Sequence, residues 1–359
     1  MVKTLALLDS ALVQANLPAA TGSGGFPLPA TWMGGYTLGR DDFVKLVNTH
    51  KARFRTAVAR TKAARDGVDW GKVLAEAEAG LDHDIDAFVG GASGWSIGFQ
   101  SSVMHIGAGW SQLSMMYYGF ADTSGAYQTW LQLPLHQRGY ILLCTPDLRW
   151  PRGCTRPAQQ ATSPQPSTWT DLPYIGNRLD PDVAGEPWGN SYYQNQRYVY
   201  IRNNSNTGQY PEFLRAENDM LVAEAAIRLG QFSKAAARID IYRSHAGLPL
   251  LTGAINDATT PVPGGNACVP KVPDPDTKVL RCGALMEAMK YEKRMETAFN
   301  RVGAWYFDSR GWGDLIEGTP LEYPLPVNEI DARYPTTLPY YNLGGGGPSS
   351  APRGTYGFP

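Results

Sequence analysis

Residues 284–331 constrain the fold more than any other part of this 359-residue chain. Glu292 and Glu296 stand four residues apart, so a helix places both carboxylates on one face. The Pro-Leu-Pro run at 324–326 then forces an extended turn. Apolar surface comes from Met286, Met289, Phe299 and Trp305. Arg294 and Arg310 are available as basic partners for the two carboxylates. The sequence therefore predicts a long helix, an aromatic-rich end and a fixed exit.

Three motifs follow one another here: Tyr291-Glu-Lys-Arg-Met-Glu, then Trp305-Tyr-Phe-Asp-Ser-Arg310-Gly-Trp-Gly313, then Pro324-Leu-Pro-Val-Asn-Glu-Ile-Asp331. Together they resemble the C-terminal signature of the SusD/RagB family, the glycan-capturing lipoproteins of the bacterial outer membrane. In that family a Glu-Arg-Arg-x-x-Glu-Leu-type helix precedes an aromatic–Asp–x–x–Arg–Trp–Gly run and a Pro-Ile-Pro-x-x-Glu-Ile/Leu-Asp segment. The residues that fit the pattern are Glu292, Arg294, Glu296, Phe299, Trp305, Phe307, Asp308, Arg310, Gly313, Pro324, Pro326, Glu329, Ile330 and Asp331.

The resemblance implies a mainly α fold: a SusD-like α-helical superhelix with TPR-like helix pairs and a loop-rich insertion with minor β structure. It implies a single unit over residues 1–359. Its parts are a helical block (1–85), a loop-rich ligand-binding region (86–210), TPR-like and signature helices (211–331) and a Gly/Pro-rich tail (332–359). No lipobox cysteine or signal peptide is visible, so the chain is expected to begin inside the family's fold.

The resemblance also implies a function: non-catalytic capture of an oligosaccharide or other oligomeric nutrient, without a cofactor. The implied partner is a SusC-type TonB-dependent transporter, contacted from the helical side, and the implied location is the extracellular face of the outer membrane. Bulk composition is compatible with this function. A net charge of -1 argues against nucleic-acid binding, and no apolar run reaches the roughly 20 residues that span a bilayer.

Hydrophobic periodicity predicts helices over residues 1–17, 41–65 and 68–81, and a helical hairpin over 213–249. In the hairpin, the turn Leu229-Gly230-x-Phe232-x-x-Ala235 resembles a tetratricopeptide repeat. Glu217 and Glu224 are predicted to be core carboxylates paired with arginines. Residues 198–201, Tyr-Val-Tyr-Ile, are predicted to form a short strand.

The four cysteines fall into two close pairs, Cys144 with Cys154 and Cys268 with Cys282. Four cysteines allow three connectivities, but each close pair brackets its own Pro/Gly-rich loop, which favours local disulfides. Disulfides would place the protein outside the cytoplasm. Buried free thiols are the alternative, and the spacing does not fit a zinc ribbon.

Eight aromatic residues lie between positions 169 and 210, among many neutral amides. This combination suits carbohydrate, because a sugar ring packs its C–H face on an aromatic ring while amides bond its hydroxyls. The alternative is that these rings pack an irregular insertion. The predicted ligand-binding residues are Trp169, Trp188, Tyr192 and Tyr193, followed by Trp95 and Trp110.

Three further patterns carry weaker chemical signals. Gly94-Trp-Ser96-Ile-Gly98 fits a nucleophile elbow, but the surrounding sequence lacks the strand–turn–helix context, which favours a glycine loop. Asp82, Asp84 and Asp86 echo the first ligands of an EF-hand without its glycine and glutamate, which favours a solvated helix end. Glu292 and Glu296 could be imagined as glycosidase acids, but their spacing along one helix favours structural ion pairs.

Two other functions stay open from the sequence. One is a helical-repeat interaction or surface-assembly protein whose aromatic loops contact another protein. The more remote one is an extracellular serine hydrolase that uses Ser96.

Overall fold

The computed structural model describes residues 2–18, 25–91, 94–95, 111–162, 164–178, 191–274, 276–300, 304–316, 318–321, 326–333 and 350–351. These residues are mainly helical, with two-stranded antiparallel sheets, which confirms the mainly α prediction. The helices before the sheets are α1 (Val2–Ala15), α2 (Arg40–Ala57), α3 (Lys62–Asp66) and α4 (Trp70–Glu78), with a 3-10 turn η2 (Ala30–Trp32).

The middle of the chain carries only short elements. Its helical pieces are α6 (Met115–Tyr118), η3 (Gly119–Ala121), α7 (Ala126–Leu131), η4 (Leu135–Gln137), α8 (Arg156–Ala161) and α9 (Val199–Asn203). Its strands are β1 (Ile85–Val89), β2 (Ile175–Asn177), β3 (Tyr193–Asn195) and β4 (Gly208–Phe213). The C-terminal part contains α10 (Arg215–Arg228), α11 (Phe232–His245), η5 (Gly265–Ala267), β5 (Lys271–Pro273), β6 (Leu280–Cys282), α12 (Leu285–Glu296), α13 (Ala304–Trp312) and α14 (Val327–Arg333).

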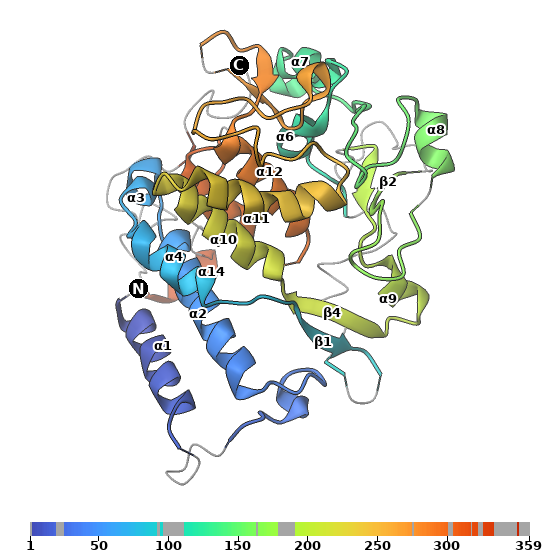
Figure 1. Ribbon diagram of the computed structural model, residues 1–359. Coiled ribbons are helices and arrows are strands. Elements are labelled where there is room, and N and C mark those ends of the chain that lie inside the picture. The colour runs from blue at the N-terminus through green and yellow to red at the C-terminus, as the bar shows by residue number, and fades with distance from the viewer. Residues whose placement is uncertain are drawn as a thin grey trace.

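Helix α10 is the central element, and α2, α4, α11 and α12 all pack against it (Figure 1). Every residue from Ala216 to Ile227 is buried, so the helix is enclosed on all sides. Small side chains at Ala223, Ala225 and Ala226 let neighbouring helices approach closely. Gly230, at a φ of 72°, turns the chain into α11 as the sequence predicts, since glycine adopts this conformation without strain.

The helix predicted over residues 41–65 is interrupted. Helix α2 ends at Ala57, and α3 starts at Lys62 after Thr61, whose hydroxyl accepts a hydrogen bond from the Ala64 N–H at 3.1 Å. Threonine is a favoured N-cap, and this local bond competes with a continuous helix. The break lets Arg65 reach into the core beside α10.

The strand predicted over residues 198–201 is wrong, because this segment begins helix α9. The Ile201 N–H donates to the Tyr198 carbonyl at 3.1 Å, and Tyr198, Val199 and Ile201 are all buried. A four-residue apolar run cannot distinguish a buried helical turn from a strand by periodicity alone.

The loop-rich middle begins and ends at neighbouring points, because β1 pairs antiparallel with β4 from Ile85↔Phe213 to Val89↔Gly208. In Figure 1 this middle part lies above and to the right of the stacked helices. Its buried core is largely aromatic and packs on Tyr291 and Met295 of α12; the aromatic members include Tyr118, Tyr127, Trp150, Tyr174 and Tyr193. Many rings of the insertion therefore do pack its interior.

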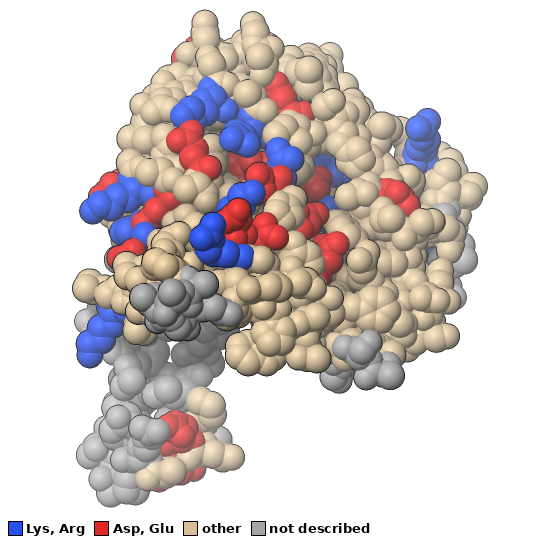
Figure 2. Space-filling model, turned by 60° about the horizontal axis from the view of Figure 1, so that its bottom comes forward, with Lys and Arg blue, Asp and Glu red and all other residues tan. Residues whose placement is uncertain are grey.

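Two further features are the distribution of surface charge and the apolarity of the helices. On the face shown in Figure 2, basic and acidic side chains are interspersed over the described surface. None of the described helices combines the length and apolarity that a bilayer crossing requires.

Candidate functional site

Two disulfides hold loops of the molecule in place. Cys144 pairs with Cys154 and Cys268 with Cys282, which confirms the local connectivity predicted from the spacing. The first bridge closes the loop that carries Asp147 and Arg149 into the core. The second closes the loop that holds β5 and β6 against each other.

Two half-buried rings of the loop-rich part, those of Tyr140 and Tyr192, lie against each other. The Tyr192 ring lies 5.2 Å from that of Tyr140, centroid to centroid, and the Arg156 guanidinium lies 4.5 Å from the Tyr192 ring centre. All three side chains are half-buried. We call Tyr140, Arg156 and Tyr192 the aromatic platform.

Hydrogen bonds from α8 fix the platform. Arg156 and Gln160 donate to the Arg178 carbonyl at 3.1 and 2.6 Å, and the Arg178 N–H donates to the Tyr192 carbonyl at 2.8 Å. The platform thus offers the aromatic surface of two tyrosines and the Arg156 guanidinium, with the Gln160 amide nearby, all held on fixed backbone. Sequence reasoning missed Tyr140 and Arg156, because both lie outside the dense aromatic segment and reach Tyr192 only through the fold.

Tyr193 does not belong to this surface. It is fully buried, and its hydroxyl donates to Gln159 at 2.8 Å while accepting from the Leu143 N–H at 2.8 Å. Burial raises the pKa of its hydroxyl. The predicted ligand role of Tyr193 is therefore replaced by a core role, because its ring has no face open to a ligand.

Trp169 and Trp95 are half-buried and anchored to the scaffold. The indole N–H of Trp169 donates to Asp84 at 3.0 Å, and its carbonyl accepts from Arg197 at 2.7 Å. The Trp95 backbone forms a parallel β-bridge with Val89, and the Trp95 ring packs on Gly34. Among the described residues, the Tyr192 ring pairs with that of Tyr140 and with neither tryptophan. Trp110, Trp188 and Ser96 lie outside the described residues.

A surface pocket of about 460 Å³ lies close to Trp169 in sequence, but none of the six predicted ligand residues lines it. Its wall is shaped by Asp171, which accepts backbone N–H bonds from Ser167 and Thr168 at 2.7 and 3.1 Å. Those bonds, the one from Ser167 foremost, lower the pKa of the Asp171 carboxyl. The lining residues are Thr162, Pro164, Gln165, Pro166, Asp171, Leu172 and Pro173.

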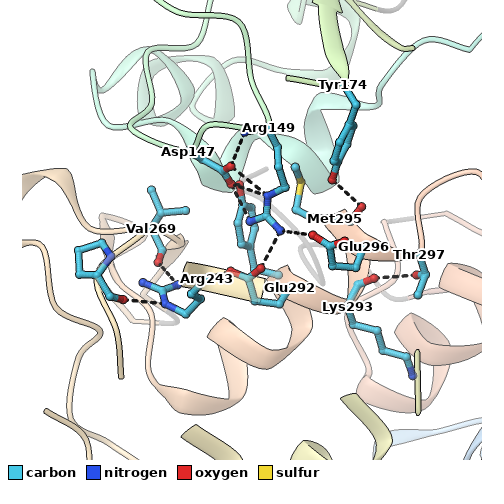
Figure 3. Close-up of polar contacts among 12 residues, drawn as sticks. Asp147, Arg149, Tyr174, Arg243, Val269, Glu292, Lys293, Met295, Glu296 and Thr297 are labelled. Atoms are coloured by element: carbon cyan, nitrogen blue, oxygen red, sulfur yellow. Dashed lines mark hydrogen bonds and ion pairs between the residues drawn. The ribbon is translucent and has the colours of Figure 1, made fainter. Parts of the chain in front are cut away.

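Glu292 and Glu296 lie in a buried charge network and not on an open surface (Figure 3). The Arg149 guanidinium donates to Glu292 at 2.7 Å and to Glu296 at 2.9 Å. The remaining members are Asp147, Arg197 and Arg243, which gives three carboxylates and three guanidinium groups. This confirms structural ion pairs, but the partners differ from the predicted ones.

The two predicted partners lie elsewhere. Arg294 bonds Asp314 at 3.0 Å, and Arg310 donates to the backbone carbonyls of Leu321 and Ala57. In contrast, the predicted pairing of the α10 carboxylates with arginines is confirmed. Arg53 holds Glu217 through two hydrogen bonds of 2.8 and 2.5 Å, and Arg65 holds Glu224 at 3.0 and 2.5 Å.

The three aspartates that echo an EF-hand do not converge. Asp82 bonds Lys45 at 2.8 Å, and Asp84 accepts from Trp169 and from the Arg215 N–H. Asp86 lies on β1 with one buried carboxylate oxygen unbonded. Within the described residues, no group of three or more His, Cys, Asp or Glu side chains is arranged to hold a metal ion.

Replacing Asp86 with asparagine is expected to stabilise the protein at pH 7 by about 1 kcal/mol, after allowance for its partial exposure. Burial first, and the Asp84 charge second, raise the pKa of Asp86 from 3.8 to about 6. A carboxyl with a raised folded-state pKa binds its proton more tightly when folded, so its stabilising contribution is lost as pH rises from about 4 to 6. Urea unfolding at pH 4 and pH 7 measures the difference.

Asp82→Asn is the matched control of opposite sign. Its hydrogen bond with Lys45 lowers the pKa of Asp82 to about 2, so the charged form stabilises the fold above pH 4. The control should therefore lose a little stability at pH 7. Equal stability of Asp86→Asn and wild type at both pH values would contradict the expectation.

Comparison with known proteins adds no relative: the sequence matches no protein-family model, and no curated protein or solved structure matches it either.

Proposed function

We propose that this protein is a non-catalytic binding protein that captures an oligosaccharide or other oligomeric nutrient at the cell surface. The aromatic platform carries the proposal, because it is an accessible pair of rings with a guanidinium and an amide beside them. Sugars bind such surfaces through ring stacking and through hydrogen bonds to neutral and charged donors.

The resemblance to the SusD/RagB family supports delivery of the ligand to a SusC-type TonB-dependent transporter at the extracellular face of the outer membrane. The two disulfides are compatible with an oxidising compartment. The paired helices α10 and α11, joined at Gly230, support a TPR-like arrangement within a SusD-like superhelix. We place the transporter contact on the helical side, away from the platform. Co-purification with a TonB-dependent transporter from the same cell tests this part.

Replacing Tyr192 with alanine is expected to weaken glycan binding about tenfold or more, because stacking on an aromatic ring and its associated contacts are lost. Tyr192→Phe keeps the ring and should bind within a few-fold of wild type. Isothermal calorimetry against an oligosaccharide panel measures the effect, and thermal melting verifies that each variant is folded.

Trp32→Ala is the matched control, because Trp32 exposes 67% of its surface on η2, outside the loop-rich part. It should leave glycan affinity unchanged. A folded Tyr192→Ala variant with wild-type affinity would exclude the platform as the binding surface. The absence of heat with every glycan would count against the capture function itself. Trp188→Ala is expected to weaken binding as well.

The alternative function, a protein-interaction or assembly role, has one supporting observation. Helix α1 exposes Val2 and Leu7 at 80% and 71%, and the 3-10 turn η2 exposes Trp32 at 67%. Under this alternative, glycan calorimetry stays silent while Leu7→Ser and Trp32→Ala reduce association with another protein. For the serine hydrolase, labelling of Ser96 by an activity-based serine probe is the decisive observation.

A further inference from the structure

The surface pocket beside Asp171 combines apolar walls with a few polar side chains. Its volume of about 460 Å³ falls within the range of small-molecule sites. Pro164, Pro166 and Pro173 give it apolar walls, and Asp171 is the one charged side chain among the residues that line it. Ligand sites are typically built in this way, with apolar surface and a small number of fixed polar groups. We call it the Asp171 pocket.

The polar groups of the Asp171 pocket are held in place by the fold. Oδ2 of Asp171 accepts the Ser167 and Thr168 N–H groups at 2.7 and 3.1 Å, and Oδ1 accepts the Thr168 hydroxyl at 3.2 Å. Asp171 is exposed, and a carboxylate accepts about four hydrogen bonds, so Oδ1 has capacity for a ligand hydroxyl. Gln165 adds an amide whose oxygen accepts from Asn203 at 3.4 Å and whose nitrogen can donate to a ligand. The pocket thus presents a fixed acceptor and an amide over a proline surface.

The Asp171 pocket and the aromatic platform flank the same two elements. Helix α8 carries Arg156 of the platform at its first residue, and Thr162, directly after its last residue, lines the pocket. Strand β2 packs on α8 (Figure 1). Pro173, two residues before β2, lines the pocket, and Arg178, directly after β2, accepts the Arg156 bond that fixes the platform. Six helical residues span about 9 Å and five extended residues about 16 Å, so one oligomer can reach both sites.

We propose that the Asp171 pocket is a second subsite for the ligand of the platform, and that this ligand is an oligosaccharide long enough to occupy both. The inference rests on the proposed capture function and adds the length of the ligand and the chemistry of its far end. An uncharged, hydroxyl-rich sugar unit fits the pocket, because its hydroxyls donate charge-assisted bonds to Asp171 and its C–H face covers the prolines. An acidic unit is disfavoured there, because the Asp171 charge repels it.

Calorimetry on the full chain tests the length of the ligand, with the disaccharide and the hexasaccharide of the malto-, cello- and xylo-oligosaccharide series as probes. In a series that binds, the hexasaccharide should bind about tenfold or more tightly than the disaccharide, because the first contact holds the chain at a high effective concentration near the second. Equal affinities for the two lengths in every series that binds would overturn the second subsite and leave the platform in place. The absence of heat with every oligomer would count against the capture function, and the second subsite would fall with it.

Two variants locate the second subsite. Asp171→Asn removes the charged acceptor but keeps an oxygen for the Ser167 and Thr168 N–H groups. It should bring the ratio of hexasaccharide to disaccharide affinity from about tenfold towards one. Gln165→Ala replaces an exposed side chain, so the fold tolerates it, and should lower the same ratio about threefold. A wild-type ratio in both folded variants would refute the location.

Asp257→Asn is the matched control for Asp171→Asn. Asp257 likewise accepts two backbone N–H bonds, from Thr259 and Thr260 at 2.6 and 2.7 Å, and it does not line the pocket. Its replacement should leave the affinity ratio at the wild-type value. Tyr192→Ala should instead weaken the binding of both lengths, which separates loss of the platform from loss of the pocket.

Discussion

Replacing Arg149 with leucine is expected to lower the free energy of unfolding by about 4 kcal/mol or more. The Arg149 side chain is fully buried and donates hydrogen bonds to Asp147, Glu292 and Glu296 at distances between 2.7 and 3.1 Å. Its loss leaves three carboxylates in the core with two remaining guanidinium groups. Removing one partner leaves an uncompensated buried charge, and this destabilises the fold far more than the intact ion pair stabilised it.

The measurement is urea unfolding followed by circular dichroism, with Arg152→Leu as the matched control. Arg152 lies in the same disulfide-closed loop but is exposed, so its replacement should change stability by about 0.5 kcal/mol at most. Arg149→Lys keeps a charge but lacks the planar fork that reaches three carboxylates, so an intermediate loss is expected. A loss in Arg149→Leu no larger than that in Arg152→Leu would show that the network does not hold the insertion on α12.

The geometry explains why the sequence identified the network's acids but not its bases. The four-residue spacing of Glu292 and Glu296 places them on one face by local geometry alone, and their structural role is confirmed. Arg294 stands only two residues from each glutamate, and residues two apart on a helix do not face one another. The guanidinium groups that hydrogen-bond to the two glutamates, those of Arg149 and Arg197, come from the loop-rich part more than ninety residues away, and only tertiary packing brings them in.

The candidate binding residues show the same division between local and long-range information. The aromatic density predicted rings in the insertion, but not which of them face solvent. Tyr192 and Tyr193 are adjacent, and because successive residues alternate sides around a strand, one is half-exposed while the other is buried. The sequence contains no signal for this choice, because the side chains on both faces of β3 are polar or aromatic. In contrast, the α10–α11 hairpin was predictable, because its apolar spacing and Gly230 are local features.

Arg65→Met is expected to destabilise the fold by about 3 to 5 kcal/mol, because Arg65 ties three helices together. From α3 it holds Glu224 of α10 through two hydrogen bonds and Asp308 of α13 at 3.1 Å. Its guanidinium also lies 5.3 Å from the ring centre of Trp312. Lys62→Met, on the exposed side of the same helix, is the control and should cost about 0.5 kcal/mol at most.

The pH dependence separates lost charge pairing from lost packing in Arg65→Met. Burial alone would raise the pKa of Glu224, but the Arg65 charge and hydrogen bonds outweigh burial and lower it to about 2. In wild type this pairing stabilises the fold above pH 4.5 and is lost as pH falls towards 2. Without Arg65, burial dominates and the pKa of Glu224 rises, so the variant should recover stability as pH falls from 7 to 5. The double variant Arg65→Met/Glu224→Met should be more stable at pH 7 than Arg65→Met, because it buries no glutamate that has lost its main partner and keeps only the longer Arg228 contact of 3.6 Å. If the double variant instead loses the sum of both single losses, and the single variant shows no recovery in acid, Arg65 acts through packing and not through its charge.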